Sequence, residues 1–232
     1  MRLIEKEIRT SAFLWLKEKS KNNGGIFNRN ELIYGFTFKG QQITLIGPTG
    51  IWFPKGFEIP ISITTTSNGP YDDGFSDEGY LEYRYRGNDP NLRDNIGLKN
   101  AYIQRVPLIY FRSIKPGKYV AVWPLFILEN DPKNLLIKAA IDPAYGIISK
   151  NIFNETDSNF IGIESEIGIR KYITAITKQR LHQSTFREFV LDAYSRQCTM
   201  CKLHHEELLD AAHIIPDSEE DGLPIVENGL SL

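Results

Sequence analysis

The residues best suited to chemistry lie near the carboxy terminus. Cys198 and Cys201 are the two cysteines of the chain, and only two residues separate them. This spacing is typical of a metal-binding or redox pair in a reducing compartment, because two cysteines cannot build a disulfide framework. His213 follows an apolar run and precedes Ile-Ile-Pro, and Asn228 begins the run Asn-Gly-Leu. A neutral imidazole can take a proton from water, so His213 is a candidate general base for hydrolysis.

The order of these residues resembles the first two parts of the HNH nuclease motif. In that family a ββα unit holds one divalent cation, Mg²⁺ or Mn²⁺, which stabilises charge on the scissile phosphate. The resemblance implies that His213 is the general base and that Asn228 fixes the geometry of the motif. Many HNH enzymes have an acidic metal ligand directly before the base. Here that residue is Ala212, which leaves Asp210 as the nearest candidate carboxylate.

Two metal sites of such a unit are incomplete in this sequence. The sequence ends at Leu232, before the helix that carries the last histidine of the motif, so we expect either a fragment of a longer protein or a truncated, inactive nuclease. A structural zinc ion normally has four ligands, and Cys198 and Cys201 supply two of them. His204 and His205 are weaker candidates for the others, and a pair of half-buried thiols without metal is the alternative.

The most basic stretch of the chain precedes this motif. Residues 169–187 contain no acidic residue, and their basic residues are Arg170, Lys171, Lys178, Arg180 and Arg187. Such a cluster either contacts DNA phosphates, with Arg180 as the candidate, or forms a solvated surface. His182 fits a solvated histidine at a helix end. Thr185 and Glu188 form a capping-box pattern, which predicts a helix that starts at Thr185.

A second group of candidate residues lies in the first half of the chain, in the runs Tyr-Asp-Asp-Gly (71–74) and Gly-Tyr-Leu-Glu-Tyr-Arg-Tyr-Arg-Gly (79–87). These runs resemble the core of SRA domains, PUA-like β-barrels that flip a modified cytosine into a pocket. Such a pocket needs aromatic faces around the base and a carboxylate that accepts a hydrogen bond from the exocyclic amine of the cytosine. The resemblance implies stacking by Tyr71 and Tyr85, edge reading by Asp72 or Asp73, and a DNA contact by Arg86. An ordinary Asp-Gly turn and strand tyrosines explain the same residues.

Taken as a whole, the chain resembles predicted restriction endonucleases that join an SRA-like reader to an HNH nuclease. We expect an α+β protein with an N-terminal helix (1–25), an SRA-like β-barrel domain (26–150), a basic linker (151–184) and a partial ββα-metal domain (185–232). The implied function is type IV-like cleavage of double-stranded DNA that carries modified cytosine. A homodimer is expected, because cutting both strands needs two sites. The alternative is a DNA-binding reader whose nuclease half is inactive.

The hydrophobic pattern predicts the elements that must position these residues. Apolar spacing predicts an amphipathic helix from Leu3 to about Lys21 and a second helix from Asn95 to Gln104. Short β-rich runs between Gly and Pro turns predict strands at 42–46, 58–65, 80–85, 119–123 and 125–128. Residues 133–166 have no clear pattern.

Composition excludes several other classes of protein. The 27 Lys and Arg residues against 29 Asp and Glu residues give a net charge of -2, which excludes a polycationic nucleic-acid coat protein but not an enzyme with a local basic patch. No run approaches the ~20 apolar residues of a membrane span, and early charges exclude a secretory signal. We therefore expect a soluble, cytoplasmic protein. A thioredoxin-like redox protein is disfavoured, because a helix rather than a strand precedes Cys198.

Overall fold

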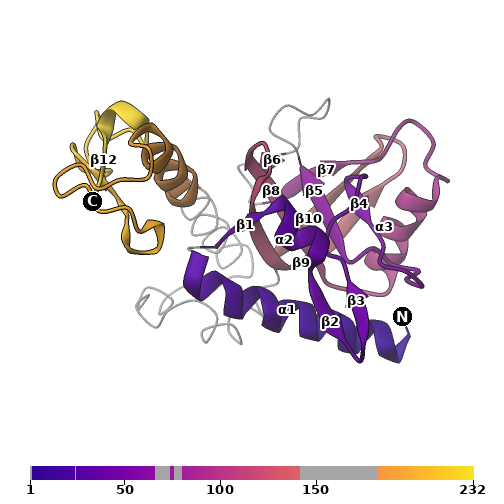
Figure 1. The fold of residues 1–232 in the computed structure, drawn as a ribbon. Helices are drawn as coiled ribbons and strands as arrows, with labels where there is room; N and C mark the ends of the chain where they lie inside the picture. Colours follow the sequence, from indigo (N-terminus) through magenta and orange to yellow (C-terminus); the bar gives the residue numbers. More distant parts are fainter. Residues whose placement is uncertain (1, 24, 66–73, 76–79, 142–181) are drawn as a thin grey trace, which may run out of the picture.

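The computed structural model describes residues 2–23, 25–65, 74–75, 80–141 and 182–232 (Figure 1). Residues 2–141 form a curled sheet with helices against it, which we call the sheet unit, and residues 182–232 form the C-terminal unit. The helices of the sheet unit are α1 (Leu3–Asn23), α2 (Arg29–Tyr34) and α3 (Arg93–Ile103). Its strands are β1 (Ile26–Asn28), β2 (Phe36–Phe38), β3 (Gln41–Ile43), β4 (Ile51–Trp52), β5 (Ser62–Thr65), β6 (Gly74–Phe75), β7 (Leu81–Arg84), β8 (Leu108–Lys115), β9 (Lys118–Asp131) and β10 (Leu136–Ile141).

The main sheet has eight strands in the order β4-β5-β8-β9-β10-β7-β6, and β1 pairs with the start of β9. β5 and β8 are parallel, and the other neighbours are antiparallel. A register shift between Lys138 and Ala139 marks a bulge, which increases the local twist. The Tyr83 hydroxyl on β7 lies 3.1 Å from the Gly50 carbonyl oxygen and 3.3 Å from that of Thr64 on β5. Strands near opposite ends of the order therefore meet, and the sheet is a curled half-barrel.

Helix α1 lies along the sheet unit (Figure 1) and is anchored to it by one buried stripe and one buried charge. Its buried hydrophobic residues, spaced one helical turn apart, are Ile8, Ala12 and Leu16. The buried Arg9 guanidinium donates hydrogen bonds to the carbonyl oxygens of Ile59 (2.8 Å) and Pro107 (3.2 Å). Burial lowers the pKa of Arg9 to about 10, and the charge of Glu5 opposes that shift. The helix is therefore fixed in one register against the sheet.

The sequence-based predictions for this unit are confirmed for helices α1 and α3 and differ at several strands. The strands predicted at 119–123 and 125–128 are one strand, β9, which continues through Pro124. β10 lies in a region for which no element was predicted. Only residues 62–65 of the strand predicted at 58–65 form β5. The half-barrel sheet agrees with the mixed helix-and-strand fold that was expected, and residues 142–181, with most of the expected linker, lie outside the described residues.

The C-terminal unit is small and built around one helix. It contains a helix over residues 182–193, followed by η3 (Glu206–Leu208), β11 (Ala211–His213), η4 (Val226–Asn228) and β12 (Gly229–Ser231). Because residues 182–184 are already helical, Thr185 lies inside the helix and the predicted capping-box start is wrong. Packing of the buried Phe186 and Val190 fixes this helix, and such tertiary contacts override a local start signal.

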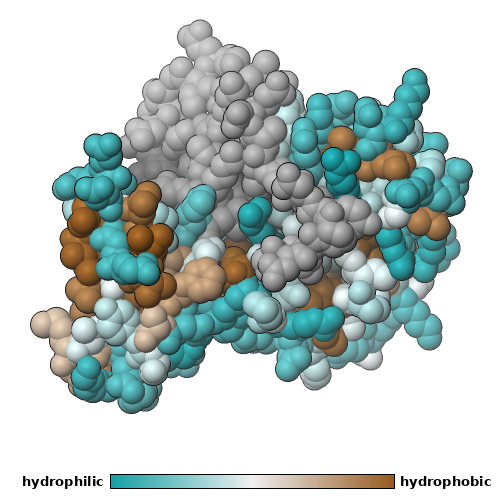
Figure 2. Space-filling model, turned by 90° about the horizontal axis from the view of Figure 1, so that it is seen from above, coloured by the Kyte–Doolittle hydropathy of each residue, from teal (hydrophilic) through white to brown (hydrophobic). Residues whose placement is uncertain are grey.

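Hydrophobic side chains also reach the surface of the C-terminal unit. In Figure 2 they gather on the part of the surface at the left, where this unit lies. The exposed large hydrophobic residues of the unit are Phe189, Met200, Leu203, Leu208, Ile214, Ile215, Leu223, Ile225 and Leu232. In the part of the chain that the structure describes, no helix has both the length and the apolar character of a membrane span.

Candidate active site

A two-stranded hairpin carries the candidate base. β11 pairs antiparallel with β12, and His213 stands opposite Gly229. The helix over 182–193 packs on the hairpin at this glycine: a Cβ atom on Gly229 would lie 2.2 Å from Val190 Cγ2 and 3.1 Å from Phe186 Cζ. The Tyr194 hydroxyl donates a hydrogen bond to the Gly229 carbonyl oxygen at 3.2 Å. The absence of a side chain at this position therefore lets the helix and the hairpin touch.

The ring of His213 is held by stacking and borders a pocket. It lies parallel to the buried ring of Phe186, with centroids 4.1 Å apart and 18° between the planes. A pocket of about 160 Å³ is lined by His182, Gln183, His213, Asp217 and Pro224. Nε2 of His213 is buried and has no hydrogen-bond partner among the described residues. Since buried polar atoms in folded proteins are almost always paired, an unpaired imidazole nitrogen beside a pocket indicates a functional group.

Asn228 fastens the loop that follows His213. Its side chain is buried, and Oδ1 accepts a hydrogen bond from the Ile215 N–H at 2.8 Å. Nδ2 donates to the carbonyl oxygens of Ile215 (3.0 Å) and Leu223 (3.1 Å). The Asn228 carbonyl oxygen also accepts from the Ile214 N–H at 2.9 Å. One side chain thus fixes both ends of the loop between β11 and η4, next to the candidate base.

The pocket contains a different carboxylate from the one that the sequence suggested. The Asp210 side chain is 84 % exposed, and its Oδ1 lies 3.4 Å from Arg187 Nε and accepts from the Ala211 N–H at 2.8 Å. The pocket is lined instead by Asp217, four residues after His213. Backbone hydrogen bonds from Glu219 to Pro216 and from Gly222 to Glu219 form the turns that return this segment.

Sequence reasoning did not single out Asp217, and it placed His182 at a solvated helix end. His182 is indeed exposed, yet it also borders the pocket of His213. The short spacing from His213 to Asp217 across Pro216 was the available signal for the carboxylate. No local signal in the sequence connects His182 with a residue more than thirty positions away.

The cysteine pair forms a tight turn. Cys198 is buried, Cys201 is exposed, and both are free. The Cys201 N–H donates to Cys198 Sγ at 3.5 Å, and the Cys198 N–H donates to the Leu203 carbonyl oxygen at 3.0 Å. Hydrogen bonds from the backbone N–H groups of Cys201 and Met200 lower the pKa of Cys198. This turn stabilises a thiolate, which is the form that binds a metal.

The described residues do not complete a metal site. Within residues 2–23, 25–65, 74–75, 80–141 and 182–232, no three His, Cys, Asp or Glu side chains gather closely enough to hold an ion. His204 and His205 therefore do not join Cys198 and Cys201, and Asp210 does not form such a group with His213. The zinc site and the Mg²⁺ or Mn²⁺ site therefore remain predictions from the resemblance.

Two of the residues predicted to contact a base or DNA lie in the described part of the sheet unit. The ring of Tyr85 is 2 % exposed, and its hydroxyl donates to Asn130 Oδ1. Burial raises the pKa of Tyr85. Arg86 is exposed and pairs with Asp94 at 2.7 Å. Tyr85 therefore packs in the core in this arrangement, and stacking on a base would require its ring to move. The predicted residues that lie outside the described ranges are Tyr71, Asp72, Asp73 and Arg180.

Comparison with known proteins gives a partial likeness. No family model matches the chain, and no curated protein matches it. One similar solved structure is the SRA domain of SUVH5 in complex with methylated CHH DNA, with a TM-score of 0.28 and 22 % identity over 39 % of this chain and 69 % of that one. Another is the same domain with fully methylated CG DNA, with a TM-score of 0.27 and 22 % identity over 39 % of this chain and 70 % of that one. Likenesses at this level do not assign the chain to a family.

Proposed function

We propose that the chain is a DNA endonuclease in which the sheet unit reads modified cytosine and the C-terminal unit hydrolyses the phosphodiester at His213. The observation that carries the hydrolytic half is the buried, unpartnered Nε2 of His213 beside a pocket. A hairpin, a stacked ring and a fastened loop surround it, as a positioned general base requires.

In this proposal the His213 imidazole takes a proton from a water molecule in the pocket that it lines. The water oxygen bonds to phosphorus while the bond from phosphorus to the leaving oxygen breaks. Phe186 keeps the imidazole plane fixed, and Asn228 is a positioning residue that holds the adjoining loop. A positioned general base contributes about 10²–10⁴-fold to the rate.

The proposal for the reading half is supported by the sequence resemblance and by chain connectivity. In the sequence, residues 71–73 follow β5 and precede β6, the strand that pairs with β7. Changing both Asp72 and Asp73 to Ala should erase discrimination between modified and plain DNA. Unchanged discrimination between modified and plain DNA would show that the reading pocket lies elsewhere in the chain.

The hydrolytic half is tested by cleavage of plasmids that differ only in cytosine modification, with Mg²⁺ or Mn²⁺ added. We expect the complete protein to cut modified plasmid and its His213→Ala variant to cut it about 10²–10⁴-fold more slowly. His205→Ala is the matched control, because His205 is exposed and does not border the pocket. Cleavage by His213→Ala at the wild-type rate would exclude the general-base role.

The same plasmids separate the alternative function. Selective binding of modified DNA without cleavage by the wild-type chain would identify a reader with an inactive nuclease half. Sedimentation of the chain on a duplex with one modified site tests the expected dimer, because two-strand cleavage needs two His213 pockets. One copy of the chain per duplex would contradict that expectation.

A further inference from the structure

The helix over residues 182–193 presents two opposite faces to two different parts of the molecule. Phe186 and Val190, one turn apart, contact the hairpin that carries His213. Glu188 and Asp192, also one turn apart, follow Phe186 and Val190 by two residues. Two residues turn an α-helix by about 200°, so this pair points away from the hairpin.

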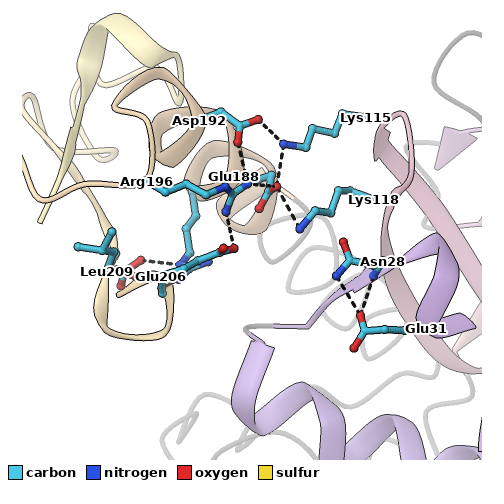
Figure 3. A network of polar contacts seen from close by, with 11 residues as sticks. Asn28, Glu31, Lys115, Lys118, Glu188, Asp192, Arg196, Glu206 and Leu209 are labelled. Atoms are coloured by element: carbon cyan, nitrogen blue, oxygen red, sulfur yellow. Dashed lines mark hydrogen bonds and ion pairs between the residues drawn. The ribbon is translucent and has the colours of Figure 1, made fainter. Parts of the chain in front are cut away.

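The second face meets the turn between β8 and β9, as Figure 3 shows. Lys115 Nζ at the end of β8 lies 2.7 Å from Glu188 Oε1 and also pairs with Asp192. Lys118 Nζ at the start of β9 lies 3.5 Å from the same Glu188 oxygen. Gly117, at φ +79°, makes the tight turn that brings the two lysines to one site.

Glu188 is the centre of this cluster. Glu188 is 1 % exposed, and its Oε1 also forms an ion pair with Arg196 Nη2 at 2.7 Å. Arg196 pairs in turn with Asp192 and Glu206. Burial alone would raise the pKa of Glu188, but hydrogen bonds from Lys115 and Arg196 outweigh it and the pKa is lowered. The carboxylate is thus held charged between cations from both units.

The hydrophobic cores do not supply an equivalent connection. Among the described residues, one buried cluster extends from Ile8 to Ala139 and belongs to the sheet unit. A separate cluster consists of Leu191, Cys198 and Leu209 in the C-terminal unit. Because Glu188 is buried, its ion pairs are screened by salt much less than exposed ion pairs are.

We propose that Glu188 docks the C-terminal unit on the β8–β9 turn through an ion-pair joint, which fixes where the His213 pocket lies relative to the sheet unit. The joint consists of Lys115, Lys118, Glu188, Asp192 and Arg196. Since the joint is a property of this chain alone, it holds whether or not the chain cuts DNA.

Carbodiimide cross-linking of the wild-type chain tests the joint directly, because the reagent links a lysine amine to a carboxylate in contact with it. Asp192 is accessible, with its side chain 41 % exposed, so we expect a Lys115–Asp192 cross-link at low salt by mass spectrometry.

The internal control is Lys39–Glu7, an exposed pair at 2.7 Å within the sheet unit, whose cross-link should form equally in the wild-type chain and in Glu188→Gln because the fold of that unit holds it. No Lys115–Asp192 cross-link in the wild-type chain at low salt would overturn the proposal. Glu188→Gln keeps the size of the side chain and removes its charge, and should abolish the cross-link. A full yield in that variant would exclude Glu188 as the centre of the joint.

A second variant protects the test from misfolding of the C-terminal unit. Lys115→Met with Lys118→Met changes only the sheet unit and leaves the pair of Glu188 and Arg196 intact. We expect its radius of gyration in low salt to exceed the wild-type value. Lys39→Met with Lys55→Met removes the same charge elsewhere in the sheet unit and should stay compact. A compact Lys115→Met, Lys118→Met chain would contradict the joint.

Discussion

The two units of the molecule are stabilised by different interactions. The sheet unit has a large apolar core, in which residues such as Ile63, Leu108 and Phe111 are fully buried. The C-terminal unit buries few hydrophobic residues and depends on polar anchors such as Asn228 and Glu188. The unit with the candidate chemistry should therefore respond to pH, salt and single polar substitutions, whereas the sheet unit should respond mainly to loss of buried volume.

The chain contains probes that report on each unit separately. Its three tryptophans, Trp15, Trp52 and Trp123, all lie in the sheet unit. Both cysteines lie in the C-terminal unit, and Cys198 is buried. Tryptophan fluorescence thus follows unfolding of the sheet unit, and the reaction rate of the Cys198 thiol follows opening of the C-terminal unit.

The largest expected effect is on the sheet unit. Phe111→Ala leaves a cavity in β8 and should lower the free energy of unfolding by about 3–5 kcal/mol in urea titrations followed by tryptophan fluorescence. The Cys198 reaction rate without denaturant should not change. Phe189→Ala, at a partly exposed ring, is the control and should leave the fluorescence transition in place. A loss below about 1 kcal/mol for Phe111→Ala would contradict the apolar account of this unit.

Asn228→Ala should have the next largest effect, and in the other unit. It leaves the N–H of Ile215 and the carbonyl oxygens of Ile215 and Leu223 without their partner. Each unpaired buried group costs about 1 kcal/mol or more, so we expect a loss of about 2–4 kcal/mol. Cys198 should then react faster while the tryptophan transition stays unchanged. A shift of the tryptophan transition without a faster reaction of Cys198 would show that Asn228 stabilises the sheet unit and not the C-terminal unit.

Gly229→Ala should cost about 1–3 kcal/mol, because its Cβ would lie 2.2 Å from Val190 Cγ2. The Cys198 reaction rate measures this loss too. Val190→Ala removes the obstructing methyl groups, so the double variant should lose less than the sum of the two single variants. Strict additivity would show that the helix and the hairpin do not meet at this glycine.

The smallest expected effect is a dependence on pH. The pKa of Glu188 is lowered in the folded chain from its usual 4.5. A carboxyl group with a lowered pKa stabilises the fold at pH values above 4.5. That stabilisation is lost as the pH falls through the lowered pKa. As the pH falls, the rate of amide hydrogen exchange, corrected for its intrinsic pH dependence, should therefore rise in peptides from residues 182–193 before it rises in β9. Glu188→Gln should remove that difference, and equal behaviour of both peptides in the wild-type chain would contradict it.

The sequence predicted features that local pattern determines. The order of His213 and Asn228 was enough to select the residues that the structure places in one hairpin and its loop. The helix α1 was predicted from the apolar residues Leu3, Ile4, Ile8, Phe13, Leu14 and Leu16. Contacts between residues that are far apart in the chain could not be predicted from the sequence. Asp210 was singled out as the carboxylate nearest to the position before His213, whereas the turn after Pro216 places Asp217 at the pocket.

Long-range contacts account for the remaining differences. Nothing near Glu188 in the sequence shows that Lys115 pairs with it, since the two residues meet only through the fold. The resemblance to SRA domains implied that Tyr85 stacks on a base, and its burial in the structure depends on the curl of the sheet and on Asn130 across it. Strand β9 was divided in two because proline usually ends a strand in sequence-based reasoning.

The division of labour between the two units is tested most directly by equilibrium binding of the His213→Ala chain, which should cut its ligand about 10²–10⁴-fold more slowly than the wild-type chain. Fluorescence anisotropy would compare duplexes that are identical except for unmodified, methylated or hydroxymethylated cytosine, at one stated salt concentration because phosphate contacts depend on salt. We predict a clear preference for one modified duplex, with the same affinity as the wild-type chain under non-cleaving conditions. Equal affinity for all three duplexes would contradict reading by the sheet unit, and loss of binding in the His213→Ala chain would contradict a purely hydrolytic role for His213.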